Sequence, residues 1–183
     1  GLGTAPTEPD GDRYERMNAH CDVLVVGAGP AGLEAALEAA RTGARVVIAG
    51  DAPLLGGTLV DRAERAEWLA NAVAELSASK DVRILVRTTI FGYYDDNYLC
   101  GVERAASGEP GPRERLWKIR AGRVVLATGA HERPLVFADN DRPGIMLASA
   151  ARAYIHRFGV APGRRAVVFA NNDDGLSVER DLA

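Results

Sequence analysis

The sequence predicts an α/β fold in which a parallel sheet carries an inserted antiparallel meander. Three observations predict it. A buried strand runs directly into a glycine-rich turn and a helix, a second buried strand follows that helix, and shorter strands then precede the return of a buried strand. Strand, helix and strand within about 30 residues form a parallel crossover unit.

The crossover unit covers residues 22–49. Residues 22–27 form a continuous apolar run of strand length, and residues 30–42 place apolar side chains at helical spacing. Gly43 then follows as the C-terminal cap of that helix. Residues 45–49 predict the second buried strand, so the two strands should lie side by side and parallel.

The pattern changes after a further helix predicted over 61–79. Turn residues then separate short segments, which is typical of an antiparallel meander. The predicted strands cover residues 82–86, 88–94, 98–104 and 116–120, and a Gly- and Pro-rich loop covers 105–115. A buried strand over 123–128 returns to the parallel type. Near the end, the sequence predicts a buried strand over 165–170, a turn over 171–175 and a helix over 176–183.

Composition excludes several classes of protein. The 183 residues carry a net charge of −3 and scattered arginines, which does not fit a nucleic-acid-binding surface. No apolar run reaches the roughly 18–20 residues of a membrane span, so we expect a cytoplasmic protein without a membrane partner. Cys21 and Cys100 are far apart and outside any Cys-x-x-Cys motif, which argues against a metal site or a redox dithiol.

A glycine-rich loop is the main candidate for a binding site. Gly27, Gly29 and Gly32 fit the pattern Gly-x-Gly-x-x-Gly between a buried strand and a helix. In a dinucleotide site these glycines allow a tight turn, an approach of the backbone to the pyrophosphate, and close helix packing. Pro30 and Ala31 begin the helix, whose free N–H groups favour phosphate. The alternative is a glycine-rich turn without a ligand.

Later residues extend this candidate cofactor-binding site. Asp51 lies about where an acid should bond the adenosine ribose, although Gly50 occupies the predicted strand tip. No Arg or Lys occurs over residues 52–58, which favours a ribose without a 2′-phosphate. Gly57 and Thr58 either approach the pyrophosphate or form a simple turn. Small residues at the end of the later buried strand leave room for a cofactor: Ala127, Thr128 and Gly129.

No catalytic set emerges. His131 has acidic and basic neighbours, but no Ser or Cys nucleophile can be argued for beside it. We expect no catalytic and no metal-ligating residue in this chain.

Several motifs resemble the alpha subunit of heterotetrameric sarcosine oxidase, within the two-dinucleotide-binding flavoprotein fold. The matching stretches are residues 21–33, 87–92, 96–98, 124–137, 140–146 and 163–169. The resemblance implies a complex with beta, gamma and delta subunits that oxidatively demethylates sarcosine to glycine, formaldehyde and hydrogen peroxide. It also implies that FAD and FMN lie mainly on the beta subunit, while NAD lies on the alpha subunit.

The same resemblance implies individual NAD contacts. They are Ala31 in the glycine-rich loop, Gly50, Asp51 and Ala52 after the second strand, Thr58, and Ile90 for the adenine. The family pattern leads us to expect two consecutive acids at 50–51, and this chain has only Asp51.

We predict a linker over 1–20, a dinucleotide-binding domain over 21–137 and, over 138–183, the start of a second, incomplete domain, so the chain should be a segment of a longer protein. Two alternatives to the NAD-binding segment stay open. One is the FAD-binding half of an opine or amino-acid oxidase or of a disulfide-reductase-like enzyme. The other is a scaffold without a ligand, which the lack of glycines over 171–174 favours.

Overall fold

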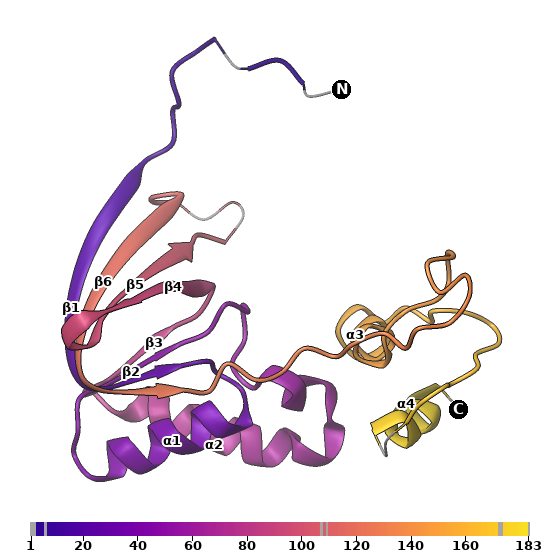
Figure 1. Ribbon diagram of the computed structural model, residues 1–183. Coiled ribbons are helices and arrows are strands. Elements are labelled where there is room, and N and C mark those ends of the chain that lie inside the picture. Colours follow the sequence, from indigo (N-terminus) through magenta and orange to yellow (C-terminus); the bar gives the residue numbers. More distant parts are fainter. Residues whose placement is uncertain (1–2, 6, 107, 109, 172–173, 183) are drawn as a thin grey trace. The chain divides into compact units, whose positions relative to one another are not determined.

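The computed structural model describes residues 3–5, 7–106, 108, 110–171 and 174–182 (Figure 1). It divides the chain into two compact units. The first unit comprises residues 1–57 and 71–128, and the second comprises residues 58–70 and 129–183. Each unit is described by itself.

The first unit is built on a six-stranded sheet in the order β3-β2-β1-β6-β5-β4. The strands are β1 (Tyr14–Val26), β2 (Val46–Ala49), β3 (Val82–Leu85), β4 (Thr88–Tyr94), β5 (Tyr98–Arg104) and β6 (Glu114–Leu126). The pairs β3–β2, β2–β1 and β1–β6 are parallel, whereas the pairs β6–β5 and β5–β4 are antiparallel. The predicted α/β fold with an inserted meander is therefore confirmed.

Three strands differ from the prediction. β1 begins at Tyr14, so residues 14–20 belong to a strand and not to an N-terminal extension. β6 is one strand where two were predicted, over 116–120 and 123–128. β1 and β6 pair from Tyr14↔Glu114 to Val26↔Leu126, and each supplies the backbone partners that keep the other extended. β3, predicted within the meander, pairs parallel with β2.

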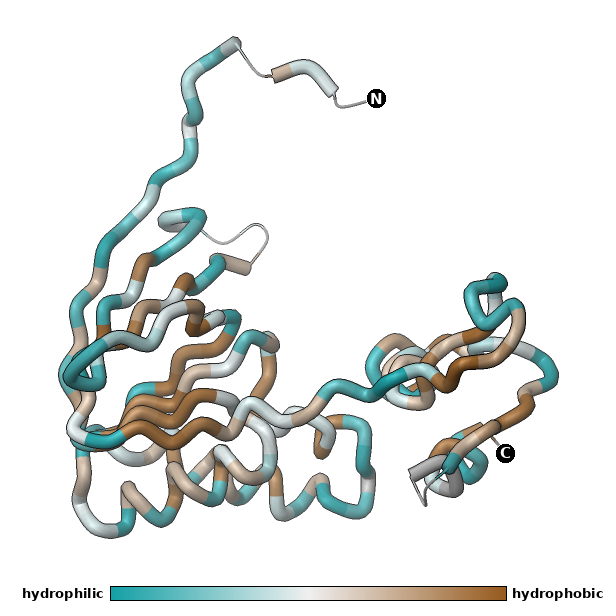
Figure 2. Tube along the Cα trace, viewed as in Figure 1, coloured by the Kyte–Doolittle hydropathy of each residue, from teal (hydrophilic) through white to brown (hydrophobic). Residues whose placement is uncertain are grey.

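Helix α1 (Pro30–Arg41) lies where it was predicted and buries Leu33, Ala36 and Leu37. The helix predicted over 61–79 begins later, because 3-10 turns occupy Gly57–Asp61 and Ala63–Arg65 before α2 (Ala66–Ala78). The hydropathy colouring in Figure 2 shows that apolar residues concentrate in the central strands, while the helices mix polar and apolar residues.

The chain connects the two edges of the sheet directly. The short 86–87 connection joins β3 at one edge to β4 at the other, and the Thr88 amide donates to the Gly50 carbonyl at 2.8 Å. Buried apolar residues form one core cluster: Ala19, Cys21, Leu24, Val26, Val47, Ala49, Leu85, Leu99, Trp117, Ile119 and Ala121. Val25, Val46 and Ile48, which alternate along β1 and β2 with members of this cluster, are also buried.

The second unit contains α3 (Ala148–Phe158) and α4 (Asp174–Leu182). The sequence analysis missed α3, whose first amides donate to the Glu132 carboxylate at 3.0 and 2.8 Å. The buried strand predicted over 165–170 is wrong: Val167 is 96% exposed and Phe169 is 71% exposed. The described residues of this unit contain no strand that could pair with it.

The turn predicted over 171–175 includes residues 172–173, which lie outside the described residues. Among the helices that the structure describes, none has the length and apolar composition needed to cross a membrane.

Candidate dinucleotide-binding site

The glycine-rich loop lies at the edge of the sheet where three parallel strands end. β1, β2 and β6 end in register at Val26, Ala49 and Leu126. β1 lies between β2 and β6, so the strand order reverses beside it, and open α/β sheets bind ligands at such a switch point. The fold therefore places residues 27–32 where a nucleotide is expected.

Two of the three glycines are required by packing. Gly27 has φ +106°, and a Cβ on it would lie 2.1 Å from the Ala127 carbonyl oxygen. A Cβ on Gly32 would lie 1.9 Å from the Gly27 carbonyl oxygen, so α1 packs directly on the end of β1. These glycines hold the loop, the helix and the return strand together whether or not a ligand is bound.

Gly29 is different, because the protein leaves space in front of it. Its φ of −78° is open to any residue, and a Cβ there would have no heavy atom within 4 Å. It is the N-cap of α1, Pro30 follows at the start of the helix, and the first turn contains no acidic residue. First-turn amides such as that of Ala31 have no acceptor within a helix, so this open end suits an anionic group.

A second segment lies against the loop. The Gly56 amide donates to the Ala28 carbonyl at 2.7 Å, and a Cβ on Gly57 would lie 2.9 Å from the Gly29 Cα. Gly50 presses on the same loop, because a Cβ there would lie 2.7 Å from the Ala28 methyl carbon. A side chain at position 50 therefore has no room unless Ala28 moves, which gives a physical reason for a single acid at 50–51.

Asp51 is exposed directly after this buried glycine, and the described residues offer its carboxylate no hydrogen-bonding partner. The next residue, Ala52, accepts a backbone hydrogen bond from Arg87 at 2.9 Å. The Asp51 carboxylate is thus free to accept hydrogen bonds from a ligand such as a ribose. Arg87 was not among the predicted site residues, because no local pattern connects it to residue 52.

The remaining predicted residues fall in different places. Ala127 donates to the Val26 carbonyl at 2.7 Å and is followed by the exposed Thr128, both beside the loop in the first unit. Ile90, on β4, packs partly against the core cluster. Thr58 and Gly129 belong to the second unit.

The chemistry of a disulfide or metal enzyme is not visible in the described part of the chain. Cys21 and Cys100 are both buried, free thiols on different strands, β1 and β5. Burial raises the pKa of the Cys21 thiol to about 11, so it is not poised as a thiolate nucleophile. Within the described ranges, no three His, Cys, Asp or Glu residues are grouped as metal ligands.

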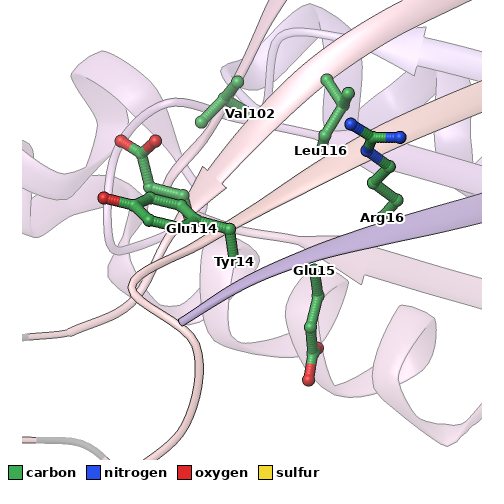
Figure 3. Close-up of a pocket in the computed structure, with 6 residues that line it drawn as sticks. All are labelled: Tyr14, Glu15, Arg16, Val102, Glu114 and Leu116. Carbon is green, nitrogen blue, oxygen red and sulfur yellow. The ribbon is translucent and has the colours of Figure 1, made fainter. Parts of the chain in front are cut away.

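A cavity of about 330 Å³ lies at the amino end of β1, far along the strand from the glycine-rich loop. Figure 3 shows its lining by Tyr14 and Arg16 of β1, Val102 of β5, and Glu114 and Leu116 of β6, while Glu15 points the other way. All of these side chains are partly or fully exposed, and we assign it no role in the site.

Residues 21–168 match the family model described as pyridine nucleotide-disulphide oxidoreductase. The chain belongs to this family. The sarcosine oxidase alpha subunit from Rhizobium meliloti (strain 1021) is 50% identical over the whole of this chain, and the one from Corynebacterium sp. (strain P-1) is 48% identical. The predicted resemblance to such alpha subunits is confirmed. The chain spans about a fifth (20%) of the length of these relatives.

More distant relatives of the family agree. One of the opine oxidase subunits of Agrobacterium tumefaciens (strain Ach5) is 33% identical over 77% of this chain, which corresponds to 30% of that protein. Among solved structures, L-proline dehydrogenase from P. horikoshii superposes with a TM-score of 0.74 at 27% identity, covering 96% of this chain and 36% of that chain. The fold and the family thus rest on sequence and structure together.

Proposed function

We propose that this chain is the NAD-binding segment of a sarcosine oxidase alpha subunit. Its identity of 46–50% to alpha subunits of that name, over all of its length, supports the proposal. In this role the chain binds and orients a dinucleotide and does not carry a complete active site. Bound NAD supplies a nicotinamide ring that can accept or donate hydride.

The observation that carries the proposal is the open space at Gly29. Gly27 and Gly32 have packing reasons to be glycine, whereas a side chain at Gly29 would meet nothing in the protein. A pyrophosphate can approach the backbone closely where no side chain intervenes. Gly29 provides such a place at the start of a helix whose first turn has no acidic residue. A scaffold without a ligand gives no such reason for this glycine.

The exposed Asp51 carboxylate supports NAD over NADP. It can accept hydrogen bonds from the two ribose hydroxyls, and it would repel a 2′-phosphate. The family description names a pyridine nucleotide, which fits NAD and NADP alike, so the choice between the two rests on Asp51. FAD along the same loop is the alternative, and the titration described below separates the two.

We further infer that the whole protein oxidatively demethylates sarcosine together with beta, gamma and delta subunits in the cytoplasm, with FAD and FMN held mainly on the beta subunit. The relative named L-proline dehydrogenase supports the substrate class, because proline and sarcosine are both secondary α-amino acids. In the described residues the two cysteines are buried and apart, which does not support a disulfide-reductase role.

Calorimetric titration of the intact protein with NAD, NADP and FAD, each run separately, tests the proposal. We expect saturable NAD binding that Gly29→Ala abolishes, because the new methyl group fills the space for the pyrophosphate. Gly11→Ala is the matched control, since a Cβ at Gly11 also meets nothing within 4 Å but lies before β1. Binding of FAD alone, or NAD binding that survives Gly29→Ala, would contradict the assignment.

A further inference from the structure

Residues 85–88, which include the connection between β3 and β4, are hydrogen-bonded to the segment that follows β2. Three backbone hydrogen bonds join them: the Gly50 amide donates to the Leu85 carbonyl at 2.9 Å, the Arg87 amide to the Ala52 carbonyl at 2.9 Å, and the Thr88 amide to the Gly50 carbonyl at 2.8 Å. This pairing fixes the backbone of Arg87 beside Ala52, one residue from Asp51.

Arg87 occupies a backbone conformation that favours glycine. Its φ is +51°, which is uncommon for a residue with a side chain and persists only where the surrounding structure enforces it. Its amide and carbonyl are both used, the carbonyl by the Arg104 amide at 3.0 Å. The side chain is exposed, and the described residues give its guanidinium no ion-pair partner. The fold therefore uses the backbone at this position but not the arginine side chain.

Ile90, which was expected to contact the adenine, is partly buried against the core. Ile90 packs against the core cluster, and its Cδ1 would lie 2.7 Å from a Cβ on Gly101 of the neighbouring strand β5. Exposed apolar surface is instead offered by Leu54, which is 62% exposed and lies two residues beyond Ala52. Besides Leu54, this edge carries the exposed side chain of Arg87, whose backbone lies beside Ala52.

We propose that the guanidinium of Arg87 stacks on the adenine ring of the bound dinucleotide. The inference rests on the proposed function, since it needs a dinucleotide whose ribose lies at Asp51. A guanidinium is planar, weakly hydrated and always charged, so it stacks well on a neutral aromatic face. Arg87 contributes affinity for the adenosine half and takes no part in chemistry.

Two substitutions and a control test this role by titration of the intact protein with NAD, ADP-ribose and NADP. Arg87→Gly removes the side chain and relieves the positive φ, so the protein should unfold at no lower temperature. We expect it to bind NAD and ADP-ribose about three- to tenfold more weakly. Arg87→Lys keeps the charge but not the plane, so most of that loss should remain. Arg16→Ala, at the amino end of β1, should bind like the wild type.

The outcomes separate this inference from the proposed function. Unchanged NAD affinity in Arg87→Gly would overturn the stacking, while NAD binding itself would stand. Full recovery in Arg87→Lys would show that charge alone matters and would also overturn it. A loss confined to NADP would assign Arg87 to a 2′-phosphate instead. If the wild type binds none of the three ligands, the proposed function fails and the stacking fails with it.

Discussion

Gly32 lies where α1 meets the end of β1, and the structure predicts that Gly32→Ala strongly destabilises the protein. A Cβ there would be 1.9 Å from the Gly27 carbonyl oxygen, whereas real Cβ atoms essentially never approach closer than 3.0 Å. The helix would therefore have to move by at least about 1.1 Å, the difference between these two distances. Such a shift disturbs the packing of Leu33, Ala36 and Leu37 on the sheet.

Forcing extra volume into a packed contact typically costs about 1–3 kcal/mol, and here the obstacle is backbone that cannot rotate away. Replacing a helical glycine by alanine also lowers the backbone entropy lost on folding, which offsets up to about 1 kcal/mol of this destabilisation. We expect a net loss of about 2 kcal/mol, which lowers the unfolding temperature by about 4–8 °C in a chain of this size.

Thermal and urea unfolding, followed by circular dichroism, measure this loss. Gly29→Ala is the control, because its new methyl group meets nothing and its φ is unstrained. We expect Gly29→Ala to change the unfolding temperature by about 1 °C at most while it abolishes binding. Equal stability of Gly32→Ala and the wild type would refute the close packing of α1 on β1.

Three further predictions concern charges and the second unit. Burial raises the pKa of the Cys21 thiol from 9.0 to about 11, so its contribution to stability is complete below pH 9 and is lost as pH rises toward 11. In Cys21→Ala the urea midpoint of unfolding should therefore fall less steeply with pH over that range than in the wild type. Parallel falls of the two midpoints would contradict this. Hydrogen bonds from Arg45 lower the pKa of Asp22 from 3.8 to about 2, so stability is lost as pH falls between these values. Asp22→Asn should weaken this acid dependence slightly in thermal unfolding, since the pair is exposed; a steeper dependence would refute it. Asp61 accepts two hydrogen bonds from Arg157, at 2.8 and 2.9 Å. Asp61→Asn should cost about 1–2 kcal/mol and speed amide hydrogen exchange in α3, and unchanged exchange there would argue against a stabilising pair.

Local patterns in the sequence were sufficient for the first crossover unit. The apolar run before Gly27, the helical spacing after Pro30 and the positive φ at Gly43 that ends α1 are all properties of short segments. The glycine-rich motif follows from the same local information, because a tight turn between a buried strand and a helix restricts which residues fit.

Long-range pairing decided what the sequence analysis missed. Residues 14–20 have the composition of a surface linker, but β6 lies beside them and supplies their hydrogen-bonding partners over the full length of both strands. The opposite error occurred at residues 165–170, which have the composition of a strand but no partner strand in the described part of their unit. Backbone groups need partners, and a pattern does not say whether a partner is present.

The sequence by itself determined that a strand, a glycine-rich turn and a helix follow one another, and which residues open that helix. Only the tertiary structure decided that Gly27 and Gly32 are glycines for packing while Gly29 faces open space. It also placed Arg87 against Ala52, 35 residues earlier in the chain. The physical reason is that turns and helices depend on neighbouring residues, whereas the contacts of a binding site depend on which distant strands lie side by side.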